Sequence, residues 1–318
     1  MKRFITMIVA ACAFFAVSAQ NPMVTLSHNG ELSFFTNIGA FKAAYDAAEN
    51  GDILYLSEGN FFIDGDNMTI EKRLSIVGSG YSSYILGKLT IKLADNPEAK
   101  MDAPLFDGVR MNTLAFYNNA NSSKTNEAMG ETEIRRCWID KLLSVSYGGT
   151  DLKIDQCFIE NITYDTGSNN VLLKNSKFHS SGNYSYNLTA MNCNIIDPNY
   201  YPRKTISCII SSSSIPDGAN GATIINSLMN QLTTDSRVKI IDCYITDQEG
   251  VTLLDENLEC VIDLNGYRGQ DGTEVGIHGG ETPFSENPSV PTVDSANSTV
   301  EYDAASNKLK VNITVKAD

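Results

Sequence analysis

The chain has 318 residues, of which 24 are basic and 38 acidic, and its formal net charge is −14. This length suits one large domain or two ordinary ones. Binding to nucleic-acid phosphates needs clustered Lys and Arg, so the negative balance argues against a nucleic-acid partner and mainly indicates a soluble surface.

The N-terminus predicts export. The basic start "MKR" precedes the apolar run "FITMIVAACAFFAV" and the small-residue sequence "SAQ". This order is typical of a secretory signal peptide, here at residues 1–19 with cleavage after Ala19. "VAAC" also resembles the site at which bacterial lipoproteins are acylated, here on Cys12, and this alternative stays open. No later apolar run is long enough to span a bilayer, so we expect a secreted or outer-surface protein.

Residues 20–50 are the expected N-terminal cap. "GAFKAAYDAAENGD" predicts a short helix from about Phe41 to Ala48, and a strand at Ile53–Leu56 follows. "LSIVGSG" from Leu74 looks like the first regular unit of a repeat. A solenoid must cover its open end, and an amphipathic helix is suited to that role.

A repeat of about 18 residues dominates positions 51–280. Counted from Cys157 as zero, the candidates for inward-facing residues lie at −5, −3, 0 and +2, which are Leu152, Ile154, Cys157 and Ile159. The same pattern recurs with zeros at Cys137, Ser176, Cys193, Ser213, Ser227 and Cys243, and an earlier match comprises Val109, Met111, Leu114 and Phe116. Residues two apart share one face of a strand, so each unit predicts two short strands with one bend between them.

The bend falls at position −1 of each unit. The gap of three residues between −3 and 0 breaks strand alternation, and one residue must turn the chain so that both strands still face inward. Asn and Asp tolerate the left-handed backbone conformation best. They occupy this position in four units, whereas three units have other residues there; the seven are Arg136, Gln156, Asn175, Asn192, Ser212, Asn226 and Asp242.

Two short strands, a bend and a variable loop, with the motif I-x-N-C/S-x-I, resemble the right-handed parallel β-helix of pectin-lyase-like proteins. The resemblance covers about Gly51 to Gly280. It implies an all-β solenoid, secreted or on the surface of Gram-negative bacteria, with coils about 4.8 Å apart and like residues stacked over like. Ile154, Leu173 and Ala190 are then expected in one row.

The cysteines fit this architecture as small buried residues. Cys137, Cys157, Cys193 and Cys243 share the zero position, where Ser takes their place in other units. This interchange indicates that side-chain volume, rather than bonding, sets the choice. A disulfide between Cys137 and Cys157 on neighbouring coils is not excluded by distance.

Outward positions with alternating charge predict ion pairs between coils. Position −2 carries Arg135, Asp155 and Lys174, and position −4 places Glu133 beside Lys153. Opposite charges on adjacent strands stabilise a sheet, so a structural role is favoured over a catalytic one.

Position +3 carries the candidate catalytic residues. Asp140, Glu160 and His179 follow one another on three coils, with Trp138 and Phe158 beside them at position +1. Two carboxylates one coil apart would suit a retaining glycosidase, and His179 could complete a metal site instead. Three polar residues on a solvated face are also ordinary, so we assign no metal.

Aromatic residues in the loops after Ser176 and Cys193 are further ligand-binding candidates: Tyr184, Tyr186, Tyr200 and Tyr201. They could form a platform for glycans or merely pack on the solenoid wall. The aspartate pair of polygalacturonases, the nucleophile motif G-x-S-x-G, the zinc motif H-E-x-x-H and the phosphate loop are all absent from the sequence, and no cofactor is expected.

The C-terminal part has two sections. Asp263–Gly280 resembles the final-coil motif of secreted bacterial β-helix proteins of the choice-of-anchor group, with His278 where that motif usually has Tyr, so a structural turn is expected. Residues 281–318 begin with a Pro-rich linker, and "STVEY" and "KLKVNITVKA" predict a β-hairpin with one apolar face. Because a lone hairpin is marginally stable, we expect it to pack on the solenoid or on a partner.

The fold alone does not determine the function, because one fold hosts many activities. The favoured hypothesis is a non-catalytic surface or envelope protein that binds glycans or acts in adhesion. A polysaccharide-degrading enzyme that uses Asp140 and Glu160 is the alternative. A structural stalk is the third.

Overall fold

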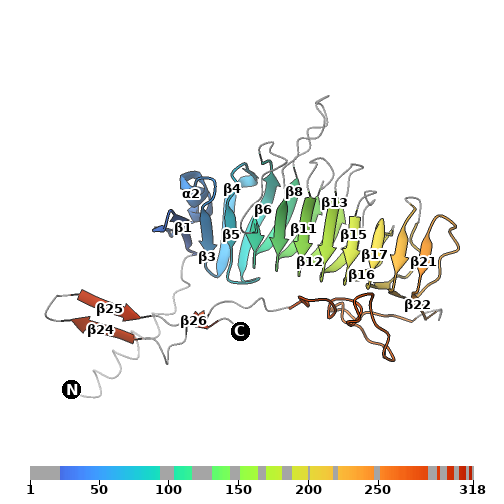
Figure 1. Ribbon diagram of the computed structural model, residues 1–318. Coiled ribbons are helices and arrows are strands. Elements are labelled where there is room, and N and C mark those ends of the chain that lie inside the picture. Colours follow the sequence, from blue (N-terminus) through green and yellow to red (C-terminus); the bar gives the residue numbers. More distant parts are fainter. Residues whose placement is uncertain are drawn as a thin grey trace, which may run out of the picture.

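The computed structural model describes residues 22–93, 104–116, 131–143, 151–163, 170–180, 188–199, 201–217, 221–246, 251–285, 292–293, 299–303, 308–312 and 315–316. The chain winds into a parallel β-helix, in which two long sheets run side by side along one axis (Figure 1). The predicted signal peptide and Cys12 lie outside the described residues, as do Tyr184, Tyr186 and Tyr200. No helix in the described ranges is long and apolar enough to cross a bilayer.

The first sheet has twelve strands, and the sheet opposite has ten. In spatial order the first comprises β2 (Glu31–Phe35), β1 (Val24–His28), β3 (Ile53–Leu56), β5 (Ser75–Val77), β7 (Phe106–Asp107), β9 (Thr132–Arg135), β11 (Asp151–Asp155), β13 (Asn170–Lys174), β15 (Leu188–Met191), β17 (Lys204–Ile206), β19 (Thr223–Ile225) and β21 (Lys239–Ile241). The second comprises β4 (Gly59–Ile70), β6 (Ser83–Ile91), β8 (Arg110–Phe116), β10 (Trp138–Leu143), β12 (Phe158–Thr163), β14 (Lys177–Ser180), β16 (Asn194–Ile196), β18 (Ile209–Ser211), β20 (Leu228–Met229) and β22 (Tyr244–Ile245).

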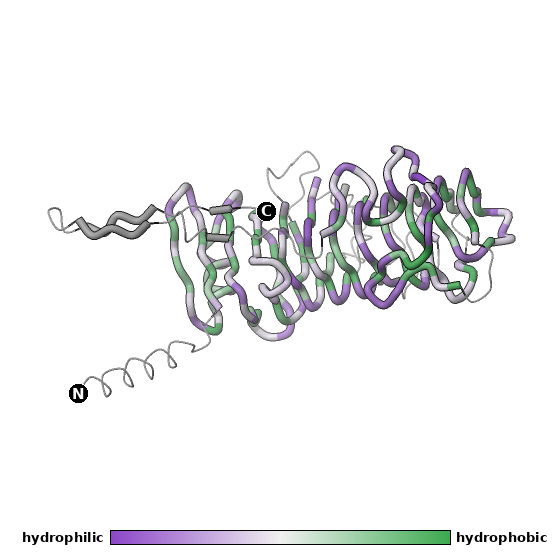
Figure 2. The backbone as a smooth tube through the Cα atoms, turned by 90° about the horizontal axis from the view of Figure 1, so that it is seen from below, coloured by the Kyte–Doolittle hydropathy of each residue, from purple (hydrophilic) through white to green (hydrophobic). Residues whose placement is uncertain are grey.

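The core is built from stacked rows of like residues. Ile154 lies opposite Leu173, and Leu173 lies opposite Ala190, so the row predicted for position −3 is confirmed. All three side chains are fully buried. Figure 2 shows the coils following one another along the long axis, with apolar and polar residues interleaved in each. This interleaving is what alternating inward and outward positions require.

The predicted bends are confirmed in six units. Backbone φ is positive at Arg136, Gln156, Asn175, Asn192, Asn226 and Asp242. In the remaining unit the bend is Ser207, with φ of 53°, and not Ser212 as predicted.

In two units, the residue predicted to occupy position zero was wrong by five residues. The register pairs Ala190 with Thr205 and Ile195 with Ile210, so the zero of that unit is Cys208 rather than Ser213. Upstream, Met111 pairs with Ile139, which makes Val109 the zero there. In the Val109 unit the cause is that the residue at position +5, Leu114, also faces inward, as Leu142 and Ile162 do in later units. In the Cys208 unit the exposed Ser213 and Ile215 continue the same spacing in sequence only. The spacing of two and then three residues therefore repeats when the position taken as zero is shifted by five residues.

The N-terminal cap combines a helix with a hairpin. Helix α2 (Ala40–Ala47) confirms the predicted helix to within a residue, and it buries Ala40, Phe41, Ala44 and Tyr45. Strand β3 has the predicted bounds. Strands β1 and β2 were not predicted; they pair antiparallel with each other, and β1 also pairs antiparallel with β3. The parallel coils begin with β3 and β4, one coil before Leu74.

The ion pairs predicted between coils are confirmed at position −4, whereas at position −2 the partner of Arg135 lies on the coil before it. Lys153 Nζ lies 2.8 Å from Glu133 Oε1, as the alternation at position −4 predicts. At position −2, Arg135 pairs with the coil before it, through Asp107 at 2.7 Å. Asp107 also pairs with Arg136 at 2.6 Å.

After β22 the chain reverses along the solenoid. Residues 251–285, the return segment, contribute no strand to either long sheet; they lie along its side (Figure 1). The segment runs along the solenoid twice. In the first run, Asn257 O accepts a hydrogen bond from Lys177. In the second run, Gly276 N donates to Ser207 O, and Pro283 O accepts from Gln156. The final-coil motif Asp263–Gly280 therefore corresponds to a strap across several coils.

The C-terminal residues form the predicted hairpin. Strand β24 (Thr299–Asp303) pairs antiparallel with β25 (Lys308–Asn312), with Val300 opposite Val311. A second short pair joins β23 (Thr292–Val293) to β26 (Val315–Lys316).

Candidate ligand-binding site

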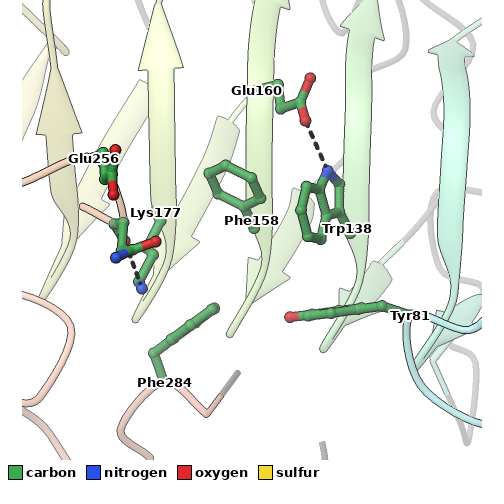
Figure 3. A pocket seen from close by; sticks show the side chains of 8 residues that line it. Tyr81, Trp138, Phe158, Glu160, Lys177, Glu256 and Phe284 are labelled. Atoms are coloured by element: carbon green, nitrogen blue, oxygen red, sulfur yellow. Dashed lines mark hydrogen bonds between the residues drawn. The ribbon is translucent and has the colours of Figure 1, made fainter. Parts of the chain in front are cut away.

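A pocket of about 490 Å³ lies between the solenoid and the return segment. Figure 3 shows the side chains of both parts converging on it. Its lining comprises Tyr81, Trp138, Phe158, Glu160, Lys177, Glu256, Asn257 and Phe284. Four of these eight residues are aromatic, and three are charged.

The solenoid supplies one wall through three neighbouring strands. Trp138, Phe158 and Lys177 are the first residues of β10, β12 and β14, and the register places them side by side. Each follows a buried Cys or Ser at position zero, so its side chain points out of the solenoid. The return segment supplies Glu256, Asn257 and Phe284 from the other side.

The aromatic rings hold one another edge to face. The Trp138 and Phe158 centroids are 4.7 Å apart with an interplanar angle of 79°, and Tyr81 meets Trp138 at 5.6 Å and 88°. Arg110 stacks its guanidinium 4.4 Å from the Trp138 ring and 4.6 Å from the Tyr84 ring. These contacts fix the rings, because edge-to-face and cation–π pairs have defined geometry.

Lys177 fastens the return segment to the solenoid. Its side chain is 2% exposed, and Nζ lies 2.7 Å from Glu259 Oε1 while it donates to Asn257 O at 2.8 Å. The same ammonium lies 4.9 Å from the Phe284 ring centroid. Glu259 also contacts His278 Nε2 at 2.7 Å through its other oxygen. The pocket wall thus depends on an ion pair between a buried ammonium and a partly exposed carboxylate.

The two candidate catalytic carboxylates occupy matching places on β10 and β12 but have different partners. Asp140 is held by Tyr84 Oη at 2.9 Å, by Arg110 at 3.2 Å and by Asn112 at 3.4 Å. Glu160 Oε1 accepts a hydrogen bond from Trp138 Nε1 at 3.2 Å. Glu160 lines the pocket, whereas Asp140 is not part of its lining.

His179, the third candidate, is partly buried beside these residues. Burial lowers its pKa from the ordinary value, while Asp197 and Glu160 raise it in part. In the described parts of the chain, no three His, Cys, Asp or Glu residues gather closely enough to hold a metal ion.

Of the aromatic candidates, Trp138 and Phe158 reach the pocket and Tyr201 does not. Tyr201 is fully buried in the core, so the interpretation of this residue as a glycan contact is corrected to that of a packing residue. Burial raises its pKa to about 12.

Five lining residues were not predicted from the sequence: Tyr81, Lys177, Glu256, Asn257 and Phe284. Tyr81 precedes β6, and the last three lie on the return segment, far along the chain from β10. One signal was present: position +1 becomes apolar in later coils, with Ile209 and Leu228. Both are buried against Leu253, Leu254 and Val275 of the return segment. An outward apolar row of this kind predicts a covered face.

Comparison with known proteins gave no match: no family model, no curated protein and no solved structure is significantly similar to the chain.

Proposed function

We propose that the protein is an exported, non-catalytic carbohydrate-binding protein of the cell surface or envelope, and that the pocket between solenoid and return segment is its binding site. The observation that carries the proposal is the convergence of Tyr81, Trp138, Phe158 and Phe284 with Glu160 on one cavity. Small-molecule sites are typically concave and aromatic, with a few polar groups that fix orientation. Rings supply apolar faces for sugar C–H groups, and carboxylates accept hydrogen bonds from hydroxyls.

Two further arguments favour a saccharide as the ligand. The chain resembles pectin-lyase-like β-helices, whose enzymes contact polysaccharides on the outside of their parallel strands. The pocket here lies on the outside of β10, β12 and β14. Export, which the N-terminal sequence predicts, would bring the protein to extracellular glycans.

Binding without cleavage is favoured over the enzyme hypothesis because of Asp140. A glycosidase needs two carboxyl groups that flank the scissile bond. Asp140 is 14% exposed in its side chain and is engaged by Arg110. Of Asp140 and Glu160, only Glu160 lines the pocket, so this pair of strand carboxylates is not presented to one ligand.

The test is a glycan array combined with a reducing-sugar assay on the mature protein. We expect binding to a subset of glycans without release of reducing ends. Trp138→Ala and the milder Glu160→Gln should weaken binding about tenfold or more, a loss of about 1.4 kcal/mol. Tyr55→Ala, an exposed aromatic residue on the other sheet, serves as the matched control and should bind normally.

Two results would contradict the proposal. Release of reducing ends that disappears in an Asp140→Asn, Glu160→Gln double variant would establish the enzyme instead. A lack of both binding and release would leave the structural stalk.

A further inference from the structure

We infer that the pocket selects saccharides that carry a free, positively charged amino group over neutral or uronic-acid saccharides. The inference rests on the proposed function, since it takes the ligand to be a saccharide. It adds the chemical class, which the charges and rings around the pocket indicate.

The charges around the pocket leave an excess of carboxylates. Lys177 is matched by Glu259 at 2.7 Å, and Arg110 beside Trp138 is matched by Asp140 at 3.2 Å. Glu160 and Glu256 also line the cavity. After these two ion pairs are formed, both of the remaining carboxylates face the space that a ligand would occupy.

The rings of the site already attract cations within the protein. Lys177 Nζ lies 4.9 Å from the Phe284 centroid, and the Arg110 guanidinium lies 4.4 Å from the Trp138 ring. Aromatic faces attract cations through the ring quadrupole, and the attraction is stronger when the cation is desolvated. Tyr81 and Phe158 complete a wall of four rings around the cavity. Rings with adjacent carboxylates are the arrangement that binds organic ammonium groups.

A uronic-acid ligand would be repelled by the same carboxylates. Its carboxylate would lie beside Glu160 and Glu256, and like charges at short range repel each other more strongly at a protein surface than in bulk water. The formal net charge of −14 adds a long-range repulsion for polyanions. For a protonated amino sugar, both the short-range interaction with the two carboxylates and the long-range interaction with the net charge are attractive.

The experiment compares two ligands that differ at one group. Isothermal titration calorimetry of the mature protein would use a glucosamine tetramer and the N-acetylglucosamine tetramer of the same linkage, at a mildly acidic pH that keeps the free amines protonated. We expect the glucosamine tetramer to bind about tenfold more tightly, with an affinity that falls as salt is added.

Variants locate the effect. Glu256→Gln and Glu160→Gln should each reduce affinity for the glucosamine tetramer about fivefold or more and should narrow the preference over the acetylated tetramer. Glu71→Gln, an exposed carboxylate paired with Lys92 on the cap side, is the control and should change neither affinity.

Equal or tighter binding of the acetylated tetramer would overturn the inference and leave the proposed function standing, provided that Trp138→Ala abolishes that binding. Failure of both tetramers would also overturn the inference. If the glycan array is blank as well, the proposed function fails with it.

Discussion

At the scale of single residues, each bend places the backbone of one residue in the left-handed conformation, with positive φ. The φ values are 44° at Asn226 and Asn175, and 54° at Gln156. Left-handed backbone costs most residues about 1–2 kcal/mol, whereas Gly is free of that cost and Asn carries less of it. This explains why Asn recurs there.

Asn226 allows a clean test because its side chain is only partly buried. Asn226→Val should lower the free energy of unfolding by about 1–2 kcal/mol, since a β-branched residue is strained at positive φ. Asn226→Gly should cost clearly less. Denaturant titration measures both, and an equal loss in the two variants would show that backbone conformation is not the cause.

The thiols of the zero position are free of disulfides, and all of them are buried except that of Cys243, which is partly exposed. Cys157 N donates to Ser176 Oγ at 3.0 Å, and Cys137 N donates to Cys157 Sγ at 3.4 Å, so Ser and Cys serve the same role in the row. Burial is the main cause that raises the pKa of Cys157 and of Cys193 well above the ordinary value.

These pKa shifts predict how stability depends on pH. Above about pH 8.5 the unfolded chain loses thiol protons that the folded chain keeps. The unfolded state then binds fewer protons, so the free energy of unfolding falls as pH rises, by about 1.4 kcal/mol per pH unit for each such thiol. Urea titrations from pH 8 to 10 should show a shallower decline in a Cys157→Ser, Cys193→Ser double variant. An unchanged slope would contradict the assignment.

At the scale of elements, the return segment is held by a few specific contacts. Its apolar residues Leu253, Leu254 and Val275 cover Ile209 and Leu228. Asn194 Nδ2 donates to Leu258 O at 2.7 Å, and Asn175 Nδ2 donates to Gly279 O at 2.7 Å. Side chains at the bends and at position +1 thus satisfy backbone groups that no strand pairs.

The Lys177–Glu259 pair should be the sensitive point of this attachment. Glu259→Ala leaves a buried ammonium without its carboxylate, and we expect a loss of about 2–3 kcal/mol in the free energy of unfolding, reduced from the fully buried case because Glu259 is partly exposed. A Lys177→Met, Glu259→Leu double variant should recover much of that loss. Chemical denaturation of the three variants is the measurement. A double variant as unstable as Glu259→Ala would contradict the view that the unpaired charge causes the loss.

At the scale of the whole molecule, the two ends of the solenoid differ. The N-terminal end is covered by α2 and the β1–β2 hairpin. At the other end, β21 pairs only with β19 and β22 only with β20 within the described part of the chain. Ile240 and Cys243 are accordingly partly exposed, whereas Ile154 and Cys157 in the middle are fully buried.

This asymmetry predicts a gradient of local stability. Amides of β21 and β22 should exchange with solvent about tenfold faster or more than those of β11 and β13, because fewer buried contacts oppose local opening at the uncovered end. Hydrogen–deuterium exchange with mass spectrometry resolves these coils. Uniform protection along the axis would show that another part of the chain covers the last coil in solution.

Much of the fold was predictable because it repeats. Position −3 is aliphatic in most coils, with Thr205 as an exception, and the bend at −1 is Asn or Asp in four units, so errors in one unit are offset by the others. The zero was misplaced where the pattern is ambiguous: at Val109 the inward Leu114 at +5 extends the same spacing, and at Cys208 the exposed Ser213 and Ile215 extend it in sequence only. Trp138, Phe158 and Glu160 were predicted as outward neighbours on adjacent coils, because the register follows from the period.

The sequence by itself thus determined the solenoid, its stacked rows and three of the eight pocket residues, since contacts between neighbouring coils repeat at a nearly constant separation along the chain. Only the tertiary structure decided that residues 251–285 turn back along the side and bring Glu256 and Phe284 to Trp138. That segment has no period, and its attachment depends on single contacts such as Lys177 with Glu259. A pairing between two unique residues 82 positions apart leaves no repeating trace in one sequence.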